Sequence, residues 1–443
     1  MWYWFAIFLA PLMISNVLQS ASQTVSFVFL GRLIGVNALG AVSAVFPVVF
    51  LLFSFLIGLS TGSTVLIGQA FGARDEHRVK KVAGTTLGAT LGLGIIVAVA
   101  GYAISPFMLA ALRTPPTLIA QADAYAKAIF LVMPVFFPYI TYTMIMRGTG
   151  DSQTPLYALV VSTLFTALFT PAFIRGWFGL PQLGVVSAAV AGAAGSAIAL
   201  AALLAYLGKI RHPLRFDAET ARDMLVDWHI LWQIVKIGVP TGIQIIMVSL
   251  AEIAVLSFVN RFGSSATAAY GAVNQIVGYV QFPAISIGIA ASIFSAQCIG
   301  ARREDLLGTV VRSAVGMSYA VGGTLILVCY VFAWVILGWF ITDAYTLHVA
   351  HTLIMITLWS YVLFGNSAVV SWVVRGSGDV IIPMLNGIFA IWAIEVPTAY
   401  ILMHFFGLNG VWMGYPISFA AVLTLQYSYY NFFWKRRVHE RLV

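Results

Sequence analysis

Long uninterrupted apolar segments dominate this 443-residue chain and restrict the folds that it can adopt. About 20 consecutive apolar residues are enough for a helix to cross a bilayer. Only 9% of the residues are charged, whereas about a quarter are charged in soluble domains. We therefore predict an all-α integral membrane protein with twelve transmembrane helices. Their approximate ranges are 4–30, 42–70, 82–111, 120–146, 155–176, 184–208, 233–260, 268–298, 310–340, 347–373, 381–406 and 409–434.

Lysine and arginine are distributed unequally between the loops on the two predicted faces. One set of alternate loops, together with the C-terminal tail, holds 18 of the 23 basic residues. Basic loops stay on the cytoplasmic side of a membrane, and an even number of spans returns the chain to the side where it began. We therefore expect a plasma (inner) membrane protein with both termini in the cytoplasm. The same distribution argues against nucleic acid as a partner, which the net charge of +8 alone would allow.

Several phrases occur twice with one constant offset. RGTGDSQTP begins at Arg147 and RGSGDVIIP at Arg375, 228 positions later, and GQAFGARDE at 68–76 returns with the same offset as AQCIGARRE at 296–304. We predict an internal duplication in which an N-lobe (1–208) and a C-lobe (233–434) of six helices each are joined by a linker (209–232) and followed by a basic tail (435–443). Because six is even, the halves have the same orientation, as in transporters whose site lies between two parallel repeats.

The repeated phrases have two possible roles. Arg147 ends one predicted helix, the glycines of the motif supply left-handed turn positions, and Asp151 can cap the next helix; Arg375 and Asp379 repeat the pattern. The motifs are then either architectural caps or parts of a cytoplasmic gate. Candidate residues for this cap or gate are Gln69, Arg147, Asp151, Gln297, Arg375 and Asp379.

Only two of the fifteen acidic residues, Glu252 and Glu395, lie well inside predicted spans. Charged groups at membrane depth cost about 2.5–3.5 kcal/mol each on insertion scales, so these glutamates are candidates for ion coupling. Glu252 either couples ions or binds a cationic substrate, or else it is held neutral by Ser249 or another hydroxyl in a packed interface. Glu395 is either a proton relay or a donor to a carbonyl that Pro397 leaves free. Desolvation favours the protonated carboxyl, which suits protons better than Na+.

Polar side chains within the spans either line a substrate cavity or join helices to one another. The candidates for the substrate cavity are Asn16, Gln23, Ser26, Gln244, Asn274 and Asn366. His348 and His351 lack a third ligand, so we expect no metal site. The chain has no phosphate-binding loop, so we expect neither ATP nor another cofactor, only a coupling ion.

The two six-helix halves, the paired Q-x-x-G-A-R and R-G-x-G-D phrases and the first-helix ending FLGRLIGVNALGAVS together resemble the multidrug and toxic compound extrusion (MATE) family, nearest its bacterial DinF-like branch. The resemblance covers essentially the whole chain. It implies a V-shaped pair of bundles that exports amphipathic, often cationic, compounds by alternating access, driven by H+ or Na+. In that branch the first helix usually carries an aspartate that acts as the cation or proton site. Ser26 stands at that place here, so the coupling acid is expected at Glu252 instead.

The leading hypothesis is a proton-coupled antiporter that exports small organic compounds, a secondary transporter rather than an enzyme, monomeric and surrounded by membrane lipid. Flipping of lipid-linked precursors is a second reading. It calls for a basic central cavity, and no Lys or Arg lies deep in a predicted helix. An intramembrane enzyme would need a catalytic constellation at one depth, for which Glu252 and Glu395 lack an obvious partner, and a passive channel would need no alternating access.

Overall fold

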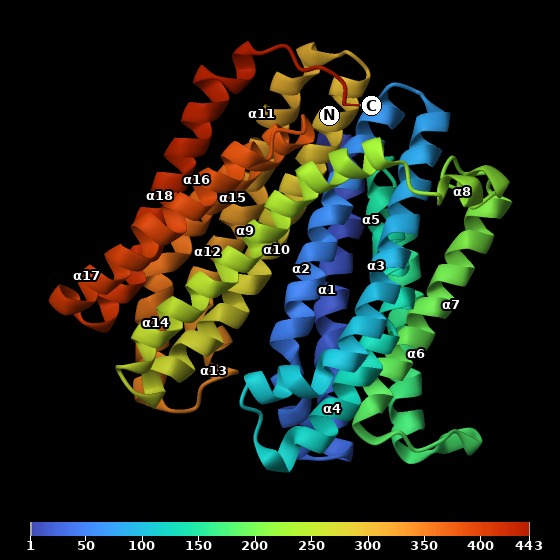
Figure 1. Cartoon of the computed structure of the whole chain (residues 1–443). Coiled ribbons are helices and arrows are strands. Elements are labelled where there is room, and N and C mark those ends of the chain that lie inside the picture. The colour runs from blue at the N-terminus through green and yellow to red at the C-terminus, as the bar shows by residue number, and fades with distance from the viewer. Residues whose placement is uncertain (1, 443) are drawn as a thin grey trace. The chain divides into compact units, whose positions relative to one another are not determined.

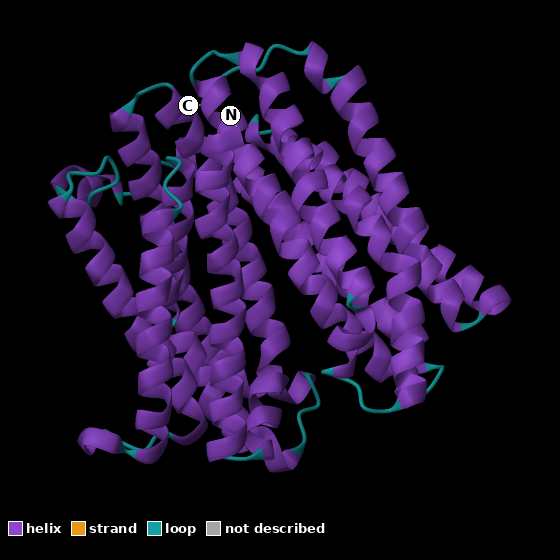
Figure 2. Ribbon diagram, turned by 180° about the vertical axis from the view of Figure 1, so that it is seen from behind, coloured by secondary structure: helices purple, strands orange, loops and turns teal. Residues whose placement is uncertain are grey.

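The computed structural model describes residues 2–442, which form helices joined by short loops (Figure 1). No strand occurs within this range (Figure 2). Eleven helices are long and apolar enough to cross a membrane, or twelve if one bent pair is counted as a single span. The prediction of an all-α protein with twelve membrane spans is therefore confirmed when that pair is one span.

The first half contains α1 to α8. The elements are α1 (Trp2–Leu33), α2 (Val36–Gly72), α3 (Glu76–Ala111), α4 (Pro116–Leu131), α5 (Met133–Gly148), α6 (Gln153–Arg175), the 3-10 turns Trp177–Gly179 and Gly184–Val186, α7 (Ser187–Lys209) and α8 (Ala218–Asp223). The predicted fourth span corresponds to α4 and α5, which meet at an angle of 53°. Pro134 lies in the first turn of α5 and cannot donate a helical hydrogen bond, which explains the break at this point.

The second half repeats the order but is interrupted more often. Its elements are α9 (Trp228–Asn260), α10 (Ser264–Gly300), a 3-10 turn (Glu304–Leu306), α11 (Leu307–Met317), the π-helical turn η4 (Ser318–Gly322), α12 (Gly323–Val331), α13 (Ala333–Gly338), α14 (Ala344–Thr357), a 3-10 turn (Leu358–Ser360), α15 (Tyr361–Gly376), α16 (Ile381–Phe389), the π-helical turn η6 (Ala390–Glu395), α17 (Val396–Phe406), α18 (Leu408–Phe432) and a 3-10 turn (Trp434–Arg436). π-helical turns inside spans are rare and occur frequently at functional sites.

The chain divides into two compact units, which we call the N-unit (Ile14–Val239) and the C-unit (residues 2–13 with Pro240–Leu442). The long helices α1 and α9 each contribute to both units. The division falls near Pro11 and at Pro240, the one internal proline of each helix. The start of α1 therefore belongs to the core of the C-unit, where Phe5 and Phe8 pack with Ile287.

The internal duplication is visible in the backbone. Helices α2 and α10 each have 37 residues and begin 228 positions apart. Four backbone positions with positive φ also recur with this spacing, which means that the turns at these positions share a left-handed residue in both halves. The pairs are Gly35 and Gly263 (114° and 95°), Arg74 and Arg302 (58° and 56°), Gly150 and Gly378 (88° and 91°), and Gly179 and Gly407 (75° and 58°).

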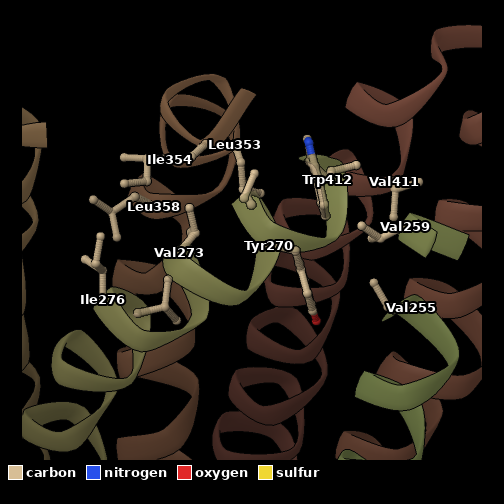
Figure 3. Packing of buried hydrophobic residues seen from close by; sticks show 14 of the residues in the cluster. Val255, Val259, Tyr270, Val273, Ile276, Leu353, Ile354, Leu358, Val411 and Trp412 are labelled. Carbon is tan, nitrogen blue, oxygen red and sulfur yellow. The ribbon is translucent and has the colours of Figure 1, made fainter. Parts of the chain in front are cut away.

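A buried aromatic and aliphatic core joins α9, α10, α14 and α18 in the C-unit (Figure 3). Tyr270 and Trp412 stack at its centre, with ring centroids 5.6 Å apart and planes at 5°. Val255 and Val259 reach this core from the second half of α9, on a face next to Glu252. The core therefore fixes the part of α9 that carries the predicted coupling acid.

Candidate functional site

Glu252 of α9 and Glu395 of η6 belong to the same group of polar residues in the C-unit. Glu395 is 6% exposed, whereas Glu252 is exposed. The two carboxyl groups interact electrostatically with each other and with the hydroxyls of Tyr270 and Tyr361. Tyr415 also interacts with Glu395. We call Glu252, Glu395, Tyr270, Tyr361 and Tyr415 the acid–tyrosine cluster.

The three tyrosines come from α10, α15 and α18 and are largely buried. The hydroxyls of Tyr270 and Tyr415 lie 2.9 Å apart and form a hydrogen bond. Phenol hydroxyls can donate hydrogen bonds to a carboxylate, and aromatic faces attract organic cations. The cluster therefore combines two acids that can gain or lose a proton with aromatic surfaces that can hold a cation.

The local backbone at Glu395 has an unusual form. Glu395 ends η6, and Pro397 follows within the first turn of α17. The Ser418 hydroxyl donates to the carbonyl of Ala390 in this turn at 3.1 Å, and it also interacts with Glu395. On the opposite side, Trp392 Nε1 donates to the carbonyl of Met247 in α9 at 3.1 Å. The π turn is thus held between α18 and α9, with Glu395 at its end.

The structure gives the two acids different surroundings. Glu252 is exposed, and within residues 2–442 no hydrogen bond joins it to Ser249; its coupling role and its retention by another hydroxyl both stay predictions. The predicted contact of Glu395 with the carbonyl that Pro397 leaves free stays a prediction, since the Ser418 hydroxyl serves a different carbonyl, that of Ala390.

The polar residues predicted for the cavity occupy different environments in the C-unit. Asn274 is exposed and interacts with the Tyr270 hydroxyl, so it adjoins the cluster. Asn366 is only 1% exposed and donates from Nδ2 to the carbonyl of Val362 at 2.9 Å. Gln244 is bound by Arg375 and packs against Gly387. Of these three predicted residues, only Asn274 is brought to the acids.

The predicted residues of α1 in the N-unit are polar but cannot replace an acid. The Ser26 hydroxyl donates to the carbonyl of Ser22 at 3.1 Å within its own helix. Gln23 is exposed, and Asn16 is partly buried. Neither serine nor an amide side chain titrates near neutral pH.

Arg375, predicted as a cap or gate residue, ties two helices of the C-unit together. Its guanidinium is 3% exposed and lies over the Trp372 ring, 5.4 Å from the centroid. It donates to Thr241 Oγ1 at 2.8 Å and to Gln244 Oε1, both on α9, and its Nε is 3.4 Å from Ser371 Oγ. Arg375 thus connects the end of α15 to α9 about two to three turns before Glu252. Its counterpart Arg147 is half-buried and interacts with Tyr139 in the N-unit.

The aspartates of the two motifs have different partners. Asp151 accepts hydrogen bonds from the backbone N–H groups of Gln153 and Thr154, both at 3.0 Å, and caps the start of α6 as predicted. Asp379 accepts instead from the Tyr429 hydroxyl, and α16 has no side-chain cap. The predicted repetition of the cap is therefore wrong for Asp379. A tyrosine on α18 provides a donor for which the first half has no equivalent.

The motif glycines also divide into two types. Gly150 and Gly378 have positive φ and form the predicted turns. Gly148 and Gly376 are helical and lie against neighbouring backbone, because a Cβ atom there would approach the carbonyl oxygens of Thr64 and Ser292 to 2.9 and 2.6 Å. The glutamines Gln69 and Gln297 lie three residues before the ends of α2 and α10.

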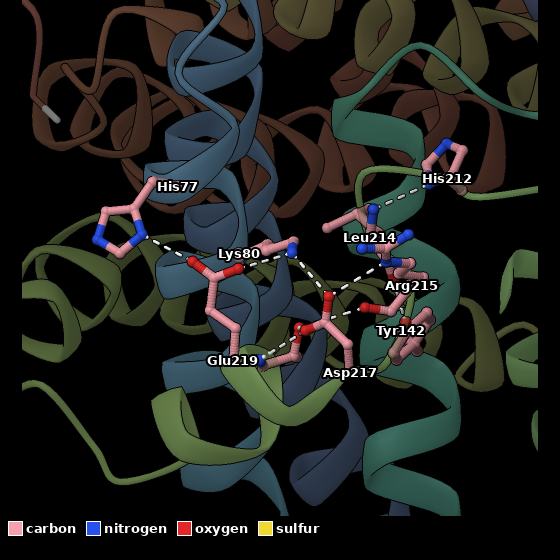
Figure 4. Close-up of polar contacts among 9 residues, drawn as sticks. His77, Lys80, Tyr142, His212, Leu214, Arg215, Asp217 and Glu219 are labelled. Carbon is pink, nitrogen blue, oxygen red and sulfur yellow. Dashed lines mark hydrogen bonds and ion pairs between the residues drawn. The ribbon is translucent and has the colours of Figure 1, made fainter.

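The linker forms an ionic network on α3 that the sequence alone did not reveal. Figure 4 shows the Lys80 amine between the carboxylates of Asp217 and Glu219, each 2.7 Å away. His77 Nδ1 lies 2.9 Å from Glu219, and Arg215 Nε lies 3.2 Å from Asp217. The hydrogen bond from Lys80 holds the pKa of Asp217 well below its usual range. Beneath the network, Gly84 and Gly88 let α8 and Met224 approach the α3 backbone.

Sequence reasoning identified the acids but missed the tyrosines around them. Tyr270, Tyr361 and Tyr415 are three of 18 tyrosines, and their positions in apolar spans do not distinguish them from residues that face lipid. Only the packing of α10, α15 and α18 brings them to Glu395. Their hydroxyls in otherwise apolar segments are the one available signal, since a buried tyrosine usually needs a hydrogen-bond partner.

Comparison with known proteins gives a consistent result along the whole chain. The MatE family model matches residues 11–172 and 240–401, one copy in each half. The probable multidrug resistance protein YoeA of Bacillus subtilis is 48% identical over 444 residues, which cover 100% of this chain and 96% of that protein. The multidrug export protein MepA of Staphylococcus aureus is 24% identical over 91% of this chain and 88% of its own length.

Solved structures share the same fold. An outward-facing multidrug resistance MATE family transporter of the MOP superfamily has a TM-score of 0.87 at 21% identity, covering 98% of this chain and 94% of that chain. A mutant of the Vibrio cholerae MATE transporter VcmN has a TM-score of 0.88 at 17% identity, covering 99% of this chain and 98% of that chain. The arrangement of helices is thus common to these proteins and the present chain.

Proposed function

Because this chain belongs to the MATE family of multi-pass membrane transporters, we propose that it exports amphipathic and cationic organic compounds by proton-driven antiport through the acid–tyrosine cluster. Like its relatives, it is a multidrug efflux transporter and not an enzyme. The coupling ion, the antiport mechanism and the residues that carry them are the proposal. The observation that carries it is the position of the buried Glu395 in η6, which Trp392 ties to α9, the helix of Glu252, near the hydrogen-bonded pair Tyr270 and Tyr415.

The chemistry of the cluster supports exchange between a proton and a cation. Two carboxylates that interact in a medium of low dielectric repel each other, so binding of a proton or a cation at one of them relieves the repulsion. A cationic substrate is attracted to the ionised pair and to the tyrosine faces. Protonation removes that attraction, so a proton that enters the cluster favours release of the cation.

The exposure of the two acids suggests separate roles. Glu252 is exposed and is the acid that meets ions and substrates first in this proposal, whereas Glu395 is buried behind it at the end of η6. Tyr270 lies near both acids and next to Asn274, so in this proposal it connects Glu252 with Glu395. In the N-unit, Ser26 cannot take a proton, so coupling rests on the C-unit in this proposal.

We further propose a monomer in the plasma membrane with both termini in the cytoplasm. The excess of Lys and Arg in one set of alternate loops supports this orientation. Substrates would then enter from the cytoplasm and leave on the outside as the two lobes alternate in access. The exported compounds and the surrounding lipid are the only partners in this scheme.

Transport by purified protein in proteoliposomes tests the proposal. A fluorescent organic cation is the probe, and a pH gradient and a Na+ gradient are imposed in separate experiments. We expect transport under the pH gradient, and a loss of about tenfold or more, equivalent to ~1.4 kcal/mol in the barrier, for Glu252→Gln and Glu395→Gln. Glu76→Gln serves as the matched control, because Glu76 is exposed at the start of α3 outside the cluster.

Three outcomes would contradict parts of the proposal. Transport driven by Na+ alone would refute proton coupling. Wild-type rates in both cluster variants under a pH gradient would remove the site assignment while leaving transport intact. Equilibration of the probe without any gradient would indicate a passive channel.

A further inference from the structure

In each half, the chain segment that follows the sixth helix packs close to the R-G-x-G-D motif: on the motif itself in the C-unit, and on Tyr142, five residues before the motif, in the N-unit. We call residues 210–217 the first strap, which follows α7, and residues 433–442 the second strap, which follows α18. The first strap belongs to the N-unit with Asp151, and the second to the C-unit with Asp379. This relationship is not part of the proposed transport chemistry and concerns different residues.

The second strap contacts Ser377 and Gly378 of its motif. Trp434 is 2% exposed, and its Nε1 donates to Ser377 Oγ at 2.9 Å. Leu442 lies against Gly378, where a Cβ atom would come within 2.4 Å of its side chain. Just before the strap, the Tyr429 hydroxyl donates to Asp379. A serine, a glycine and an aspartate in sequence thus each meet a different residue from the end of the chain.

The second strap also has an internal order that favours one docked position. Trp434 stacks between Tyr430 and His439, with centroids 5.3 and 4.1 Å away. The backbone N–H of His439 lies 3.4 Å from Oε1 of Glu304, the last residue of the other repeated phrase of this half. The stack folds the strap back over the motif, so that its end reaches Gly378.

The first strap holds its motif region through different residues. The Tyr142 hydroxyl on α5 donates to the carbonyl of Leu214, whose side chain is 2% exposed. The backbone N–H of Leu214 in turn donates to His212 Nδ1 at 3.1 Å. Asp217, at the end of this strap, is bound by Lys80 on α3. The strap is therefore fixed at its middle to α5 and at its end to α3.

We propose that the second strap docks on the R-G-x-G-D motif of its half and the first strap on the helix that leads into its motif, and that each docked strap clamps the loop between the fourth and fifth spans of that half. The physical reason is that buried polar groups need partners: the Trp434 indole N–H serves Ser377 in the C-unit, and the Tyr142 hydroxyl serves the carbonyl of Leu214 in the N-unit. If the proposed alternating access holds, the clamps keep the motif end of each half intact while the halves move.

Hydrogen exchange of the full-length protein in detergent measures docking of each strap separately. Trp434→Phe keeps the ring stack but removes the Nε1–H donor to Ser377, and Ser377→Ala removes the acceptor. Both should make exchange in residues 434–442 about tenfold faster, the change that corresponds to one lost hydrogen bond of roughly 1.4 kcal/mol. Tyr142→Phe should have the same effect on residues 210–217. Each variant should leave the other strap unchanged, so the two straps act as controls for each other.

A second measurement keeps the proposal testable if exchange is too fast to resolve. In a background with Cys298→Ser and Cys329→Ser, the variant Ser377→Cys should react slowly with a maleimide and about tenfold faster when Trp434→Phe is added. Thr149→Cys in the other half should react equally in both proteins. Both readouts are independent of transport, so failure of the proposed coupling would not affect them.

Two results would overturn the proposal. One is hydrogen exchange in residues 434–442 of the wild type that is as fast as in an unstructured peptide, and the other is no faster exchange at either strap in the three variants. Acceleration of both straps by one variant would show general unfolding. In that case Ser377→Ala, the smaller substitution, is decisive. Wild-type exchange rates in the second strap of that variant contradict docking, and faster exchange confined to the second strap supports it.

Discussion

The hydroxyl groups of Tyr270 on α10 and Tyr415 on α18 form a hydrogen bond of 2.9 Å next to the two glutamates of the C-unit. This bond joins two helices at the cluster and orients both phenols. Tyr270 also stacks on Trp412, so its ring has little freedom to move. The positions of the groups that surround Glu395 are therefore set by the packing of the core rather than by the acid itself.

Removal of one hydroxyl tests the importance of this pair. Tyr415→Phe leaves the Tyr270 hydroxyl without its partner while the ring volume is kept. We expect proton-driven export to fall by about three- to tenfold, the effect of a lost hydrogen bond of about 1 kcal/mol. The measurement is the initial rate of transport at several external pH values. Tyr279→Phe, an exposed tyrosine on the same α10, should retain the wild-type rate; equal losses in both variants would count against the cluster.

Arg375 should be important for stability because its guanidinium is buried and serves three side chains. Arg375→Lys keeps the charge but cannot bind Thr241 and Gln244 with a planar fork. We expect a loss of roughly 1–3 kcal/mol in the free energy of unfolding, the cost of leaving buried polar groups without partners. A clear decrease of Tm in detergent checks this, with the exposed Arg303→Lys as the control. Equal Tm values for the two variants would contradict a structural role for Arg375.

The helical glycines of the motifs should not tolerate a methyl group. At Gly376 a Cβ atom would lie 2.6 Å from the carbonyl oxygen of Ser292, and a backbone atom cannot rotate away. Gly376→Ala should therefore destabilise the protein by about 1–3 kcal/mol through overpacking. Gly271→Ala on α10 has nothing within 4 Å and should be neutral or slightly stabilising. Thermal unfolding of the two variants side by side gives the comparison.

The ionic network of the linker should persist in mild acid. The hydrogen bond from Lys80 lowers the pKa of Asp217 in the folded protein, so the carboxylate stabilises the folded state at every pH above the pKa of the unfolded chain, about 3.9. This contribution is lost only as the pH falls below that value and through the lower folded pKa. Hydrogen exchange in residues 218–223 should thus remain slow from pH 7 to about pH 5 after correction for the intrinsic rate. Lys80→Met should accelerate it throughout this range, and Lys81→Met, whose partner is Asp227, should have a smaller effect.

The sequence by itself determined the features that depend on the bilayer and on duplication. Long apolar segments must become helices in a membrane because no water is available to satisfy the backbone. The offset of 228 residues between phrases predicted matching halves, and the backbone repeats at Gly150 and Gly378 follow from it. Glu252 and Glu395 could be named in advance because acids at membrane depth are rare.

Only the tertiary structure decided which of these residues meet. Gln244 was predicted to line a cavity, yet it is held by Arg375, because the packing of α15 on α9 places a buried guanidinium there. Asp379 accepts a hydrogen bond from a tyrosine on α18 and does not cap the next helix as predicted. The three tyrosines near Glu395 come from helices far apart in the chain. Hydropathy and local motifs indicate how each segment satisfies the hydrogen-bonding groups of its own backbone. The contacts between segments depend on side-chain directions in three dimensions, which no spacing along the chain specifies.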